Sequence, residues 1–217
     1  MDSVSLSIQT GEAVGLLGVN GAGKTSTLKA VLGMLRPAQG TIRFLGYHPG
    51  DPRAFQNLGF APEEGTAPEY LSAKEWLLFC GTLRFGDSQK VEKEADELLH
   101  WFELRGEESV RSYSKGMKKR LLLAQTFLGN PKFLILDEPL NGLDPIVIMK
   151  LRNRLEKYCQ EGGTLLYCSH ILAEVEKVCR RIVILSQGKI LADCSVESLV
   201  AEFGSVEKAF AAKVGIS

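Results

Sequence analysis

The feature that most constrains this chain is a glycine-rich loop that ends in lysine and threonine and lies between an apolar run and a helical stretch. Residues 18–25 read Gly-Val-Asn-Gly-Ala-Gly-Lys-Thr and match the pattern G-x-x-x-x-G-K-[ST]. Residues 13–17 are apolar, and residues 24–35 are typical of a helix that stops before Arg36-Pro37. This order of strand, glycine turn and helix predicts a P-loop within an α/β fold.

A P-loop captures anions because its glycines let the backbone curl until successive N–H groups face one concavity, to which the helix N-terminus adds partial positive charge. We expect Lys24 to bridge two phosphates of a nucleotide, Thr25 to bind Mg²⁺ and Ser26 to donate to a neighbouring phosphate oxygen. The alternative is a glycine-rich turn that only packs against its neighbours. The placement of the motif between a strand and a helix disfavours this alternative. The residues expected to form the cradle are Gly18, Asn20, Gly21, Ala22, Gly23, Lys24, Thr25 and Ser26.

Two adjacent acids follow the apolar residues 133–136, at what would be the carboxyl end of a buried strand. Open α/β sheets bind ligands at that edge. Asp137 suits Mg²⁺, held through water, and Glu138 suits polarising the attacking water. His170, which comes just after the apolar residues 164–168, would stabilise charge as a phosphate leaves. A solvated strand end and a structural histidine are the alternatives, and the P-loop in the same chain favours catalysis.

The rest of the pattern predicts helices on a mainly parallel sheet. Residues 40–45 alternate loosely like a strand, and Ser72 and Glu75 form a capping box ahead of a helix. The other expected elements are helices near residues 91–102 and 145–160, a strand at 181–185 and a turn at Gln187-Gly188. We therefore expect one domain, with residues 1–60 and 130–217 as the α/β core and a helical subdomain inserted at about residues 65–125.

Composition narrows the partners. Lys plus Arg and Asp plus Glu both number 26, so no overall basic field argues for nucleic acid. The five cysteines include no C-x-x-C pair, which suits reduced thiols of a cytosolic protein. No stretch approaches the roughly 18 apolar residues of a spanning helix. A membrane role would therefore require another subunit.

Residues 113–120, Tyr-Ser-Lys-Gly-Met-Lys-Lys-Arg, resemble the signature motif of ATP-binding-cassette (ABC) ATPases. Residues 141–145, Asn-Gly-Leu-Asp-Pro, resemble the D-loop of that family, and His170 matches its switch histidine. The order and spacing of these motifs fit the family over nearly the whole chain. The resemblance implies a P-loop NTPase core and a head-to-tail dimer, in which each ATP lies between the P-loop of one subunit and the signature helix of the other.

In such a dimer Ser114, at a helix N-cap, and the Gly116 N–H would form a second anion site that clasps the γ-phosphate. Asp144 would lie at the shared interface. The alternative is a capped surface helix on which Lys118, Lys119 and Arg120 are simply solvated.

Three departures from the family pattern are visible. The common signature is Leu-Ser-Gly-Gly-Gln, and this chain keeps only its serine and second glycine. Where the family has a glutamine after the second core strand, this chain offers Glu63, which could still bind Mg²⁺. Only residues 1–17 precede the P-loop, and none is aromatic. We therefore expect a truncated N-terminal β region, weak nucleotide affinity and an exposed strand edge prone to association.

The resemblance implies an ATP-hydrolysing subunit that pairs with an identical or different ABC ATPase and drives an integral membrane permease from the cytoplasmic face of the membrane. The helical insert and residues 63–70 would form the coupling surface, and the motif variants resemble subunits of bacterial exporters of drugs, lipids or polysaccharides. One alternative is a soluble ABC ATPase of translation or DNA repair, which usually has two cassettes, long coiled coils or zinc motifs. A P-loop kinase or GTPase is the other, but residues 141–144 lack the lysine of a guanine-reading N-K-x-D motif.

Overall fold

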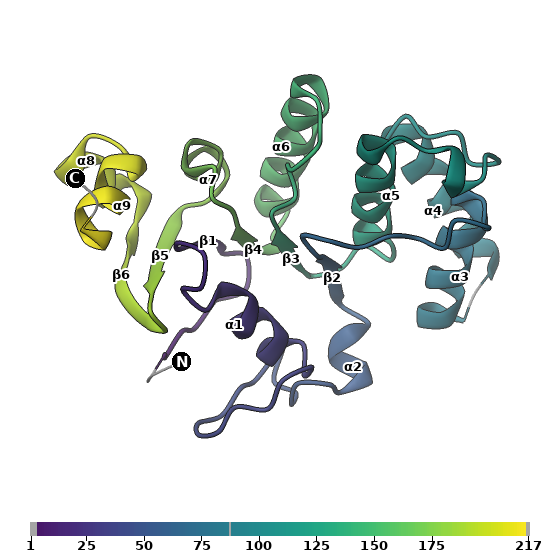
Figure 1. Cartoon of the computed structure of the whole chain (residues 1–217). Coiled ribbons are helices and arrows are strands. Elements are labelled where there is room, and N and C mark those ends of the chain that lie inside the picture. The colour runs from purple at the N-terminus through teal and green to yellow at the C-terminus, as the bar shows by residue number, and fades with distance from the viewer. Residues whose placement is uncertain (1–3, 87, 216–217) are drawn as a thin grey trace. The chain divides into compact units, whose positions relative to one another are not determined.

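The computed structural model describes residues 4–86 and 88–215, with only the backbone of Ser88 (Figure 1). The chain divides into two compact units, and each is described by itself. The first unit consists of Met1–Ala54 and Arg154–Ser217, and the second of Phe55–Asn153.

The first unit is built on a sheet in which one central strand is parallel to two neighbours. β1 (Ala13–Leu17) lies between β4 (Thr164–Cys168) and β5 (Arg181–Ser186). β6 (Lys189–Ser195) returns antiparallel to β5. The connecting residues Gln187 and Gly188 both have positive φ, 47° and 74°, as a tight hairpin turn requires. The sheet is therefore parallel except for β6.

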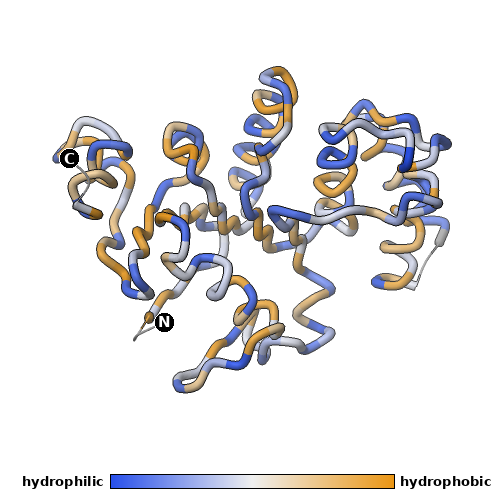
Figure 2. Tube along the Cα trace, viewed as in Figure 1, coloured by the Kyte–Doolittle hydropathy of each residue, from blue (hydrophilic) through white to orange (hydrophobic). Residues whose placement is uncertain are grey.

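Apolar side chains explain why these strands are buried. Every residue of β1 and β4 is buried, and Figure 2 shows the apolar colour running along the strands. β1 also lies against α7 (Leu172–Val178): a Cβ on Gly15 would lie 2.3 Å from Val175 Cγ1. Any larger residue here would force Val175 to move, which explains the glycine at this position.

The C-terminal part of the first unit covers the β5–β6 hairpin. α8 (Val196–Phe203) and α9 (Val206–Val214) follow β6 directly, and α9 packs on α7 (Figure 1). A Glu176 carboxylate oxygen of α7 accepts a hydrogen bond from the Val206 N–H at 3.2 Å. The unit also contains α1 (Lys24–Val31), most of α2 (Pro52–Phe55) and the second half of α6 (Pro145–Gln160).

The second unit combines two parallel strands with a helical layer. β2 (Leu58–Ala61) pairs with β3 (Phe133–Asp137). α5 (Lys115–Phe127) packs on β2, where a Cβ on Gly59 would lie 2.1 Å from the Thr126 carbonyl oxygen. The remaining elements, which pack with α5 or lead into it, are α3 (Ala73–Phe85), α4 (Ser88–Trp101) and the 3-10 turn Val110–Ser112.

The capping box predicted ahead of α3 is confirmed. The Glu75 N–H donates to Ser72 Oγ at 3.1 Å, and the Ser72 N–H donates to the Glu75 carboxylate at 2.7 Å. That second bond is the main reason why the pKa of Glu75 lies below its ordinary value. Both donors are thereby satisfied where the helix has no internal acceptors.

The expected elements at residues 133–136, 145–160, 164–168 and 181–185 are confirmed to within a residue or two. The strand expected at residues 40–45 is wrong, because the chain reverses immediately at Leu45 and Gly46, and only a single bridge joins Phe44 to Tyr47. Of the expected N-terminal β region, the described residues before α2 contain just that bridge and β1.

The helix that opens at Lys24 ends at Val31 instead of residue 35, because Gly33 takes a left-handed conformation (φ 73°). The proposed division into an α/β core and a helical subdomain with boundaries near residues 65 and 125 stays a prediction. Within residues 4–86 and 88–215, no helix combines the length and apolar character needed to cross a membrane.

Candidate nucleotide-binding site

The glycine loop is held tightly between β1 and α1. A Cβ on Gly18 would lie 2.5 Å from the Leu185 carbonyl oxygen, so β5 leaves room only for glycine. Gly21 and Gly23 have φ of 79° and 110°, which L side chains rarely adopt. The Gly188 N–H of the β5–β6 turn donates to the Ala22 carbonyl oxygen at 2.9 Å. The loop therefore has a defined shape even without a bound anion.

The N-terminus of α1 is not capped by a side chain. Its N-cap residue is Gly23, and its first turn, which begins with Lys24, contains no acidic residue. In contrast, Ser72 caps α3 and Ser114 caps α5. An eight-residue helix with an uncapped N-terminus after a glycine loop leaves its N–H groups and its partial positive charge to an external anion.

Lys24 lies across its own loop. Its Nζ donates to the Gly18 carbonyl oxygen at 2.6 Å, and the residue is only half-buried. Thr25 and Ser26 are exposed, as are Asn20 and Gly21 at the tip of the loop. The hydroxyls of Thr25 and Ser26 and the ammonium of Lys24 thus lie within one turn and are accessible from solvent.

His170 leaves the sheet beside the P-loop. β4 runs parallel to β1, with Cys168 opposite Leu16, so both strands deliver their next residues to the same edge. Ser169 is buried and its Oγ accepts a hydrogen bond from the Ile171 N–H at 3.1 Å, whereas His170 is exposed. The strand pairing places His170 beside the P-loop, and its role in hydrolysis stays a prediction.

In the second unit, Asp137 and Glu138 are both buried at the end of β3. Glu138 has a φ of 46°, a left-handed conformation that costs a non-glycine residue about 1–3 kcal/mol. This turn ends the regular alternation of side chains along the strand. Backbone strain of this kind is concentrated at functional sites, which agrees with separate roles for the two acids.

Glu63 lies just after β2, the strand parallel to β3, so its loop leaves the sheet at the same edge as Asp137. The Glu63 residue is exposed, and its backbone carbonyl accepts a hydrogen bond from Lys119 Nζ at 3.1 Å. The role predicted for Glu63 as a Mg²⁺ ligand is compatible with this placement and stays a prediction.

Lys119 is buried, so the alternative of a capped surface helix with three solvated cations is wrong for this residue. Its Nζ also donates to the Pro62 carbonyl oxygen at 3.2 Å. Burial lowers the pKa of Lys119, and the negative charges of Asp137, Glu63 and Glu138 act in the opposite direction. Lys118, in contrast, forms an ion pair with Glu69 at 2.7 Å near the surface.

The signature-like turn lies against the D-loop-like segment within the second unit. Ser114 is exposed at the N-cap of α5, where its Oγ accepts from the Met117 N–H at 3.2 Å. A Cβ on Gly116 would lie 3.0 Å from the Gly142 carbonyl oxygen. Asp144 caps α6 by accepting from two backbone N–H groups at 3.1 Å. The side chains of Ser114 and Asp144 therefore each cap a helix, in addition to the roles predicted for them at the nucleotide.

The residues present fit a nucleotide polyphosphate and Mg²⁺. The uncapped α1 N-terminus and the ammonium of Lys24 offer donors and positive charge to an anion. The hydroxyl of Thr25 and the carboxylates of Asp137 and Glu63 offer oxygen, the ligand type that Mg²⁺ prefers. Thr25 belongs to the first unit and the two acids to the second.

These features define the class of P-loop nucleotide-binding α/β proteins. The family model described as ABC transporter matches residues 1–141. The chain belongs to the ABC transporter family, so the kinase and GTPase alternatives no longer apply.

Curated relatives agree with this assignment. An ABC transporter ATP-binding protein of Synechocystis is 36% identical over 91% of this chain and 57% of its own length. One of Nostoc is 38% identical, over 90% of this chain and 60% of its own length. Nod factor export ATP-binding protein I of Neorhizobium galegae is 35% identical, over 92% of this chain and 59% of its own length. The chain thus spans less than two thirds of the length of these relatives.

Solved structures show the same fold. The ATP-binding subunit of an ABC transporter has a TM-score of 0.90 and 30% identity, covering 97% of this chain and 91% of the other. A dimeric ATP-binding cassette in a post-hydrolysis state, bound to ADP and Pi, has a TM-score of 0.79 at 22% identity over 88% of both chains. The second likeness shows the fold alone.

Proposed function

We propose that this chain is the ATP-binding and ATP-hydrolysing subunit of an ABC transporter. The observation that carries the proposal is the uncapped N-terminus of α1, which opens directly from a rigid glycine loop and begins with Lys24. Membership in the ABC transporter family supports ATP as the nucleotide. A helix end of this kind has unsatisfied N–H groups that can donate hydrogen bonds to the oxygens of a phosphate.

Each expected site residue then has a task. The backbone N–H groups of residues 18–26 and Lys24 would bind the phosphates, and Thr25, Asp137 and Glu63 would hold Mg²⁺. Bound Mg²⁺ would neutralise phosphate charge during transfer. Glu138 accepts a proton from the attacking water, and the exposed His170 donates to the departing phosphate.

A second copy, identical or related, would complete the site. Ser114 lies exposed at the N-cap of α5, and its hydroxyl hydrogen can donate to a phosphate while the oxygen keeps its bond to Met117. Gly116 and the exposed Asp144 flank the same surface of the second unit. The dimeric neighbour supports this arrangement only at the level of the fold.

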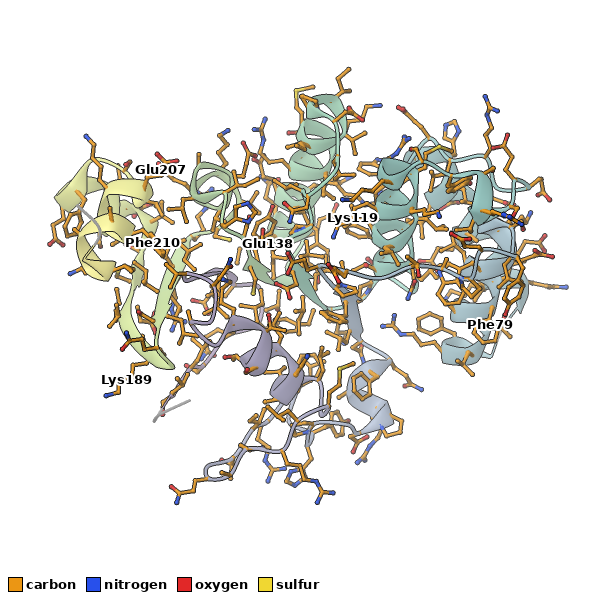
Figure 3. All side chains as sticks on the ribbon, viewed as in Figure 1. Phe79, Lys119, Glu138, Lys189, Glu207 and Phe210 are labelled. Carbon is orange, nitrogen blue, oxygen red and sulfur yellow. The ribbon has the colours of Figure 1, made fainter. Side chains whose placement is uncertain are left out.

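The coupling surface for a membrane permease would lie on α3 and the loop before it. Tyr70 and Leu83 are 84% and 78% exposed, and Phe79 also projects from the unit (Figure 3). Large apolar side chains gathered on one surface mark an interaction site. A Nod factor export relative supports an exporter-type permease, which would hold this subunit at the cytoplasmic face of the membrane.

Hydrolysis is tested by phosphate release from MgATP. Glu138→Gln keeps the size and burial of the side chain but removes the base, and we expect a rate loss on the order of 100-fold or more. Glu64→Gln makes the same chemical change at an exposed position and serves as the control, so its hydrolysis rate should stay within about 2-fold of that of the unmodified chain. Equal rates for Glu138→Gln and the unmodified chain would refute the catalytic assignment.

Permease docking is tested by co-purification with any membrane subunit whose gene lies next to the gene of this chain. Leu83→Glu places a charge on the exposed apolar surface and should abolish capture without affecting hydrolysis. Leu191→Glu is the matched control, because Leu191 is also exposed but lies on β6 in the first unit. Capture by both variants, or by neither, would contradict this coupling surface. The absence of any membrane subunit in the complex would favour a soluble ABC ATPase.

A further inference from the structure

Lys119 is a buried cation at the joint between the signature helix and the loop that follows β2. It lies on α5, five residues after Ser114, and only 7% of it is exposed. Its Nζ donates to the carbonyl oxygens of Pro62 and Glu63 at 3.2 and 3.1 Å. Figure 3 labels Lys119 on α5 and Glu138 at the end of β3, both in the second unit.

Packing alone does not require a cation at this position. Removing an ammonium from water costs several kcal/mol, at an order-of-magnitude estimate, unless it is paired and hydrogen-bonded. α5 already packs closely on β2, where the Thr126 carbonyl oxygen lies against Gly59. An apolar residue would therefore hold the helix on the strand at lower cost, so the charge itself needs an explanation.

Three carboxylates give that explanation: Asp137 and Glu138 lie at the end of β3, Glu63 follows the paired strand β2, and their negative charges act on the pKa of Lys119 against the effect of burial. Asp137 and Glu138 are buried acids proposed to bind Mg²⁺ and to activate water. Glu63 adds one more negative charge at the same sheet edge. A fixed cation within this group lowers the repulsion among the acids and toward bound phosphates.

We propose that Lys119 is a positioning residue that fastens the Glu63 loop to the signature helix and offsets the charge of the Glu63 carboxylate. This inference rests on the proposed ATPase function. It makes the loop and α5 move together, so that a contact at Ser114 changes the position of Glu63. The neighbouring Lys118 pairs instead with Glu69, which lies beyond residues 63–67, so it is not part of this link.

The mechanical part is tested by hydrogen exchange of the amides of residues 63–67. Lys119→Met removes the two hydrogen bonds and keeps an unbranched apolar stem, so we expect exchange to accelerate on the order of 10-fold or more as the loop detaches. Lys119→Arg keeps the donors and should restore most of the protection. Lys118→Met is the matched control and should leave these amides unchanged. This measurement needs no nucleotide and no activity.

The electrostatic part is tested by a double-mutant cycle on hydrolysis. Lys119→Gln keeps a donor for the carbonyl oxygens but removes the charge, and should lower kcat on the order of 10-fold with little change in KM for ATP. Adding Glu63→Gln removes the charge that Lys119 offsets. The double variant should then be several-fold faster than the product of the two single effects, as expected for two charges that are coupled to each other.

The outcomes separate this inference from the function on which it rests. If the unmodified chain releases no phosphate, the ATPase assignment is refuted. The link is kept in that case if Lys119→Met accelerates exchange and Lys119→Arg does not. Unchanged exchange in Lys119→Met would overturn the link. Single effects of Lys119→Gln and Glu63→Gln that simply multiply would overturn the charge compensation.

Discussion

Two lysines of this chain both donate to backbone carbonyls of loops that follow buried strands, yet they serve different purposes. Lys24 reaches only six residues back to Gly18, through one hydrogen bond, and is half-buried. Lys119 reaches Pro62 and Glu63, more than 50 residues earlier in the chain, and is buried. The first contact is local and exchangeable, and the second joins two elements of the fold.

The difference shows how one residue type can bind a ligand or position a loop. The ammonium of Lys24 is solvated and has donors to spare, so a phosphate can take it from Gly18 at little cost. The ammonium of Lys119 has left water already and depends on its fixed partners. Substitutions at Lys24 should therefore impair nucleotide binding and hydrolysis, whereas substitutions around Lys119 should affect the packing of the loop and helix.

The largest expected effect is on Lys24. Lys24→Met should reduce hydrolysis on the order of 100-fold to 1,000-fold, because a donor at the transferred phosphate is lost. Stability should change by less than about 0.5 kcal/mol, because the lost bond is local and partly solvated. Calorimetric titration with MgATP and urea unfolding measure the two effects. A Lys24→Met variant that still binds MgATP with the affinity of the unmodified chain would contradict the ligand role.

The joint around Lys119 should be sensitive to packing. Gly59→Ala forces a Cβ to within 2.1 Å of the Thr126 carbonyl oxygen, where α5 lies on β2. We expect a loss of about 2–3 kcal/mol in the free energy of unfolding, because backbone must shift. Gly65→Ala is the control: its Cβ would lie 3.1 Å from Pro62 Cγ, so the loss should be under about 1 kcal/mol. Equal losses would mean that the α5–β2 contact is adaptable.

Two serine caps distinguish a binding helix end from a structural one. Ser114→Ala and Ser72→Ala each remove a side-chain cap and should each cost about 1 kcal/mol of stability. Only Ser114→Ala should also slow hydrolysis, because only that cap is proposed to contact phosphate. Thermal melts and phosphate release test both points. Equal rates for the two variants would remove Ser114 from the site.

The smallest effect concerns pH and the capping box of α3. The folded pKa of Glu75 is lowered from 4.5, chiefly by the Ser72 N–H. Its contribution to stability is therefore complete above about pH 4.5 and is lost as pH falls through the lower folded pKa. The difference in urea midpoint between the unmodified chain and Glu75→Gln should accordingly shrink from pH 7 to pH 3. A difference that stays constant with pH would contradict this.

Much of the fold could be predicted from the sequence because the buried strands are apolar and their neighbours carry recognisable motifs. β1, β3 and β4 are short apolar runs that end in the P-loop, the paired acids and His170. The capping box of Ser72 and Glu75 likewise has a local cause. In each case the pattern and the structure depend on adjacent residues.

Long-range packing explains what was missed. The helix after the P-loop ends early at Gly33, which takes a left-handed conformation at a point where the Gly50 backbone leaves no room for a Cβ. The alternative that left Lys119 solvated rested on its place in a run of three basic residues. Its position four residues before Leu123 and seven before Thr126, both buried, was the signal that it shares their helix face.

Association is the most direct test of the central claim that two copies close over shared nucleotide. Sedimentation of Glu138→Gln should show a monomer alone and a species of twice the monomer mass with MgATP, because slowed hydrolysis preserves the closed state. Adding Ser114→Ala to that variant should weaken the dimer. A Glu138→Gln chain that binds MgATP and remains monomeric at every concentration would contradict the account.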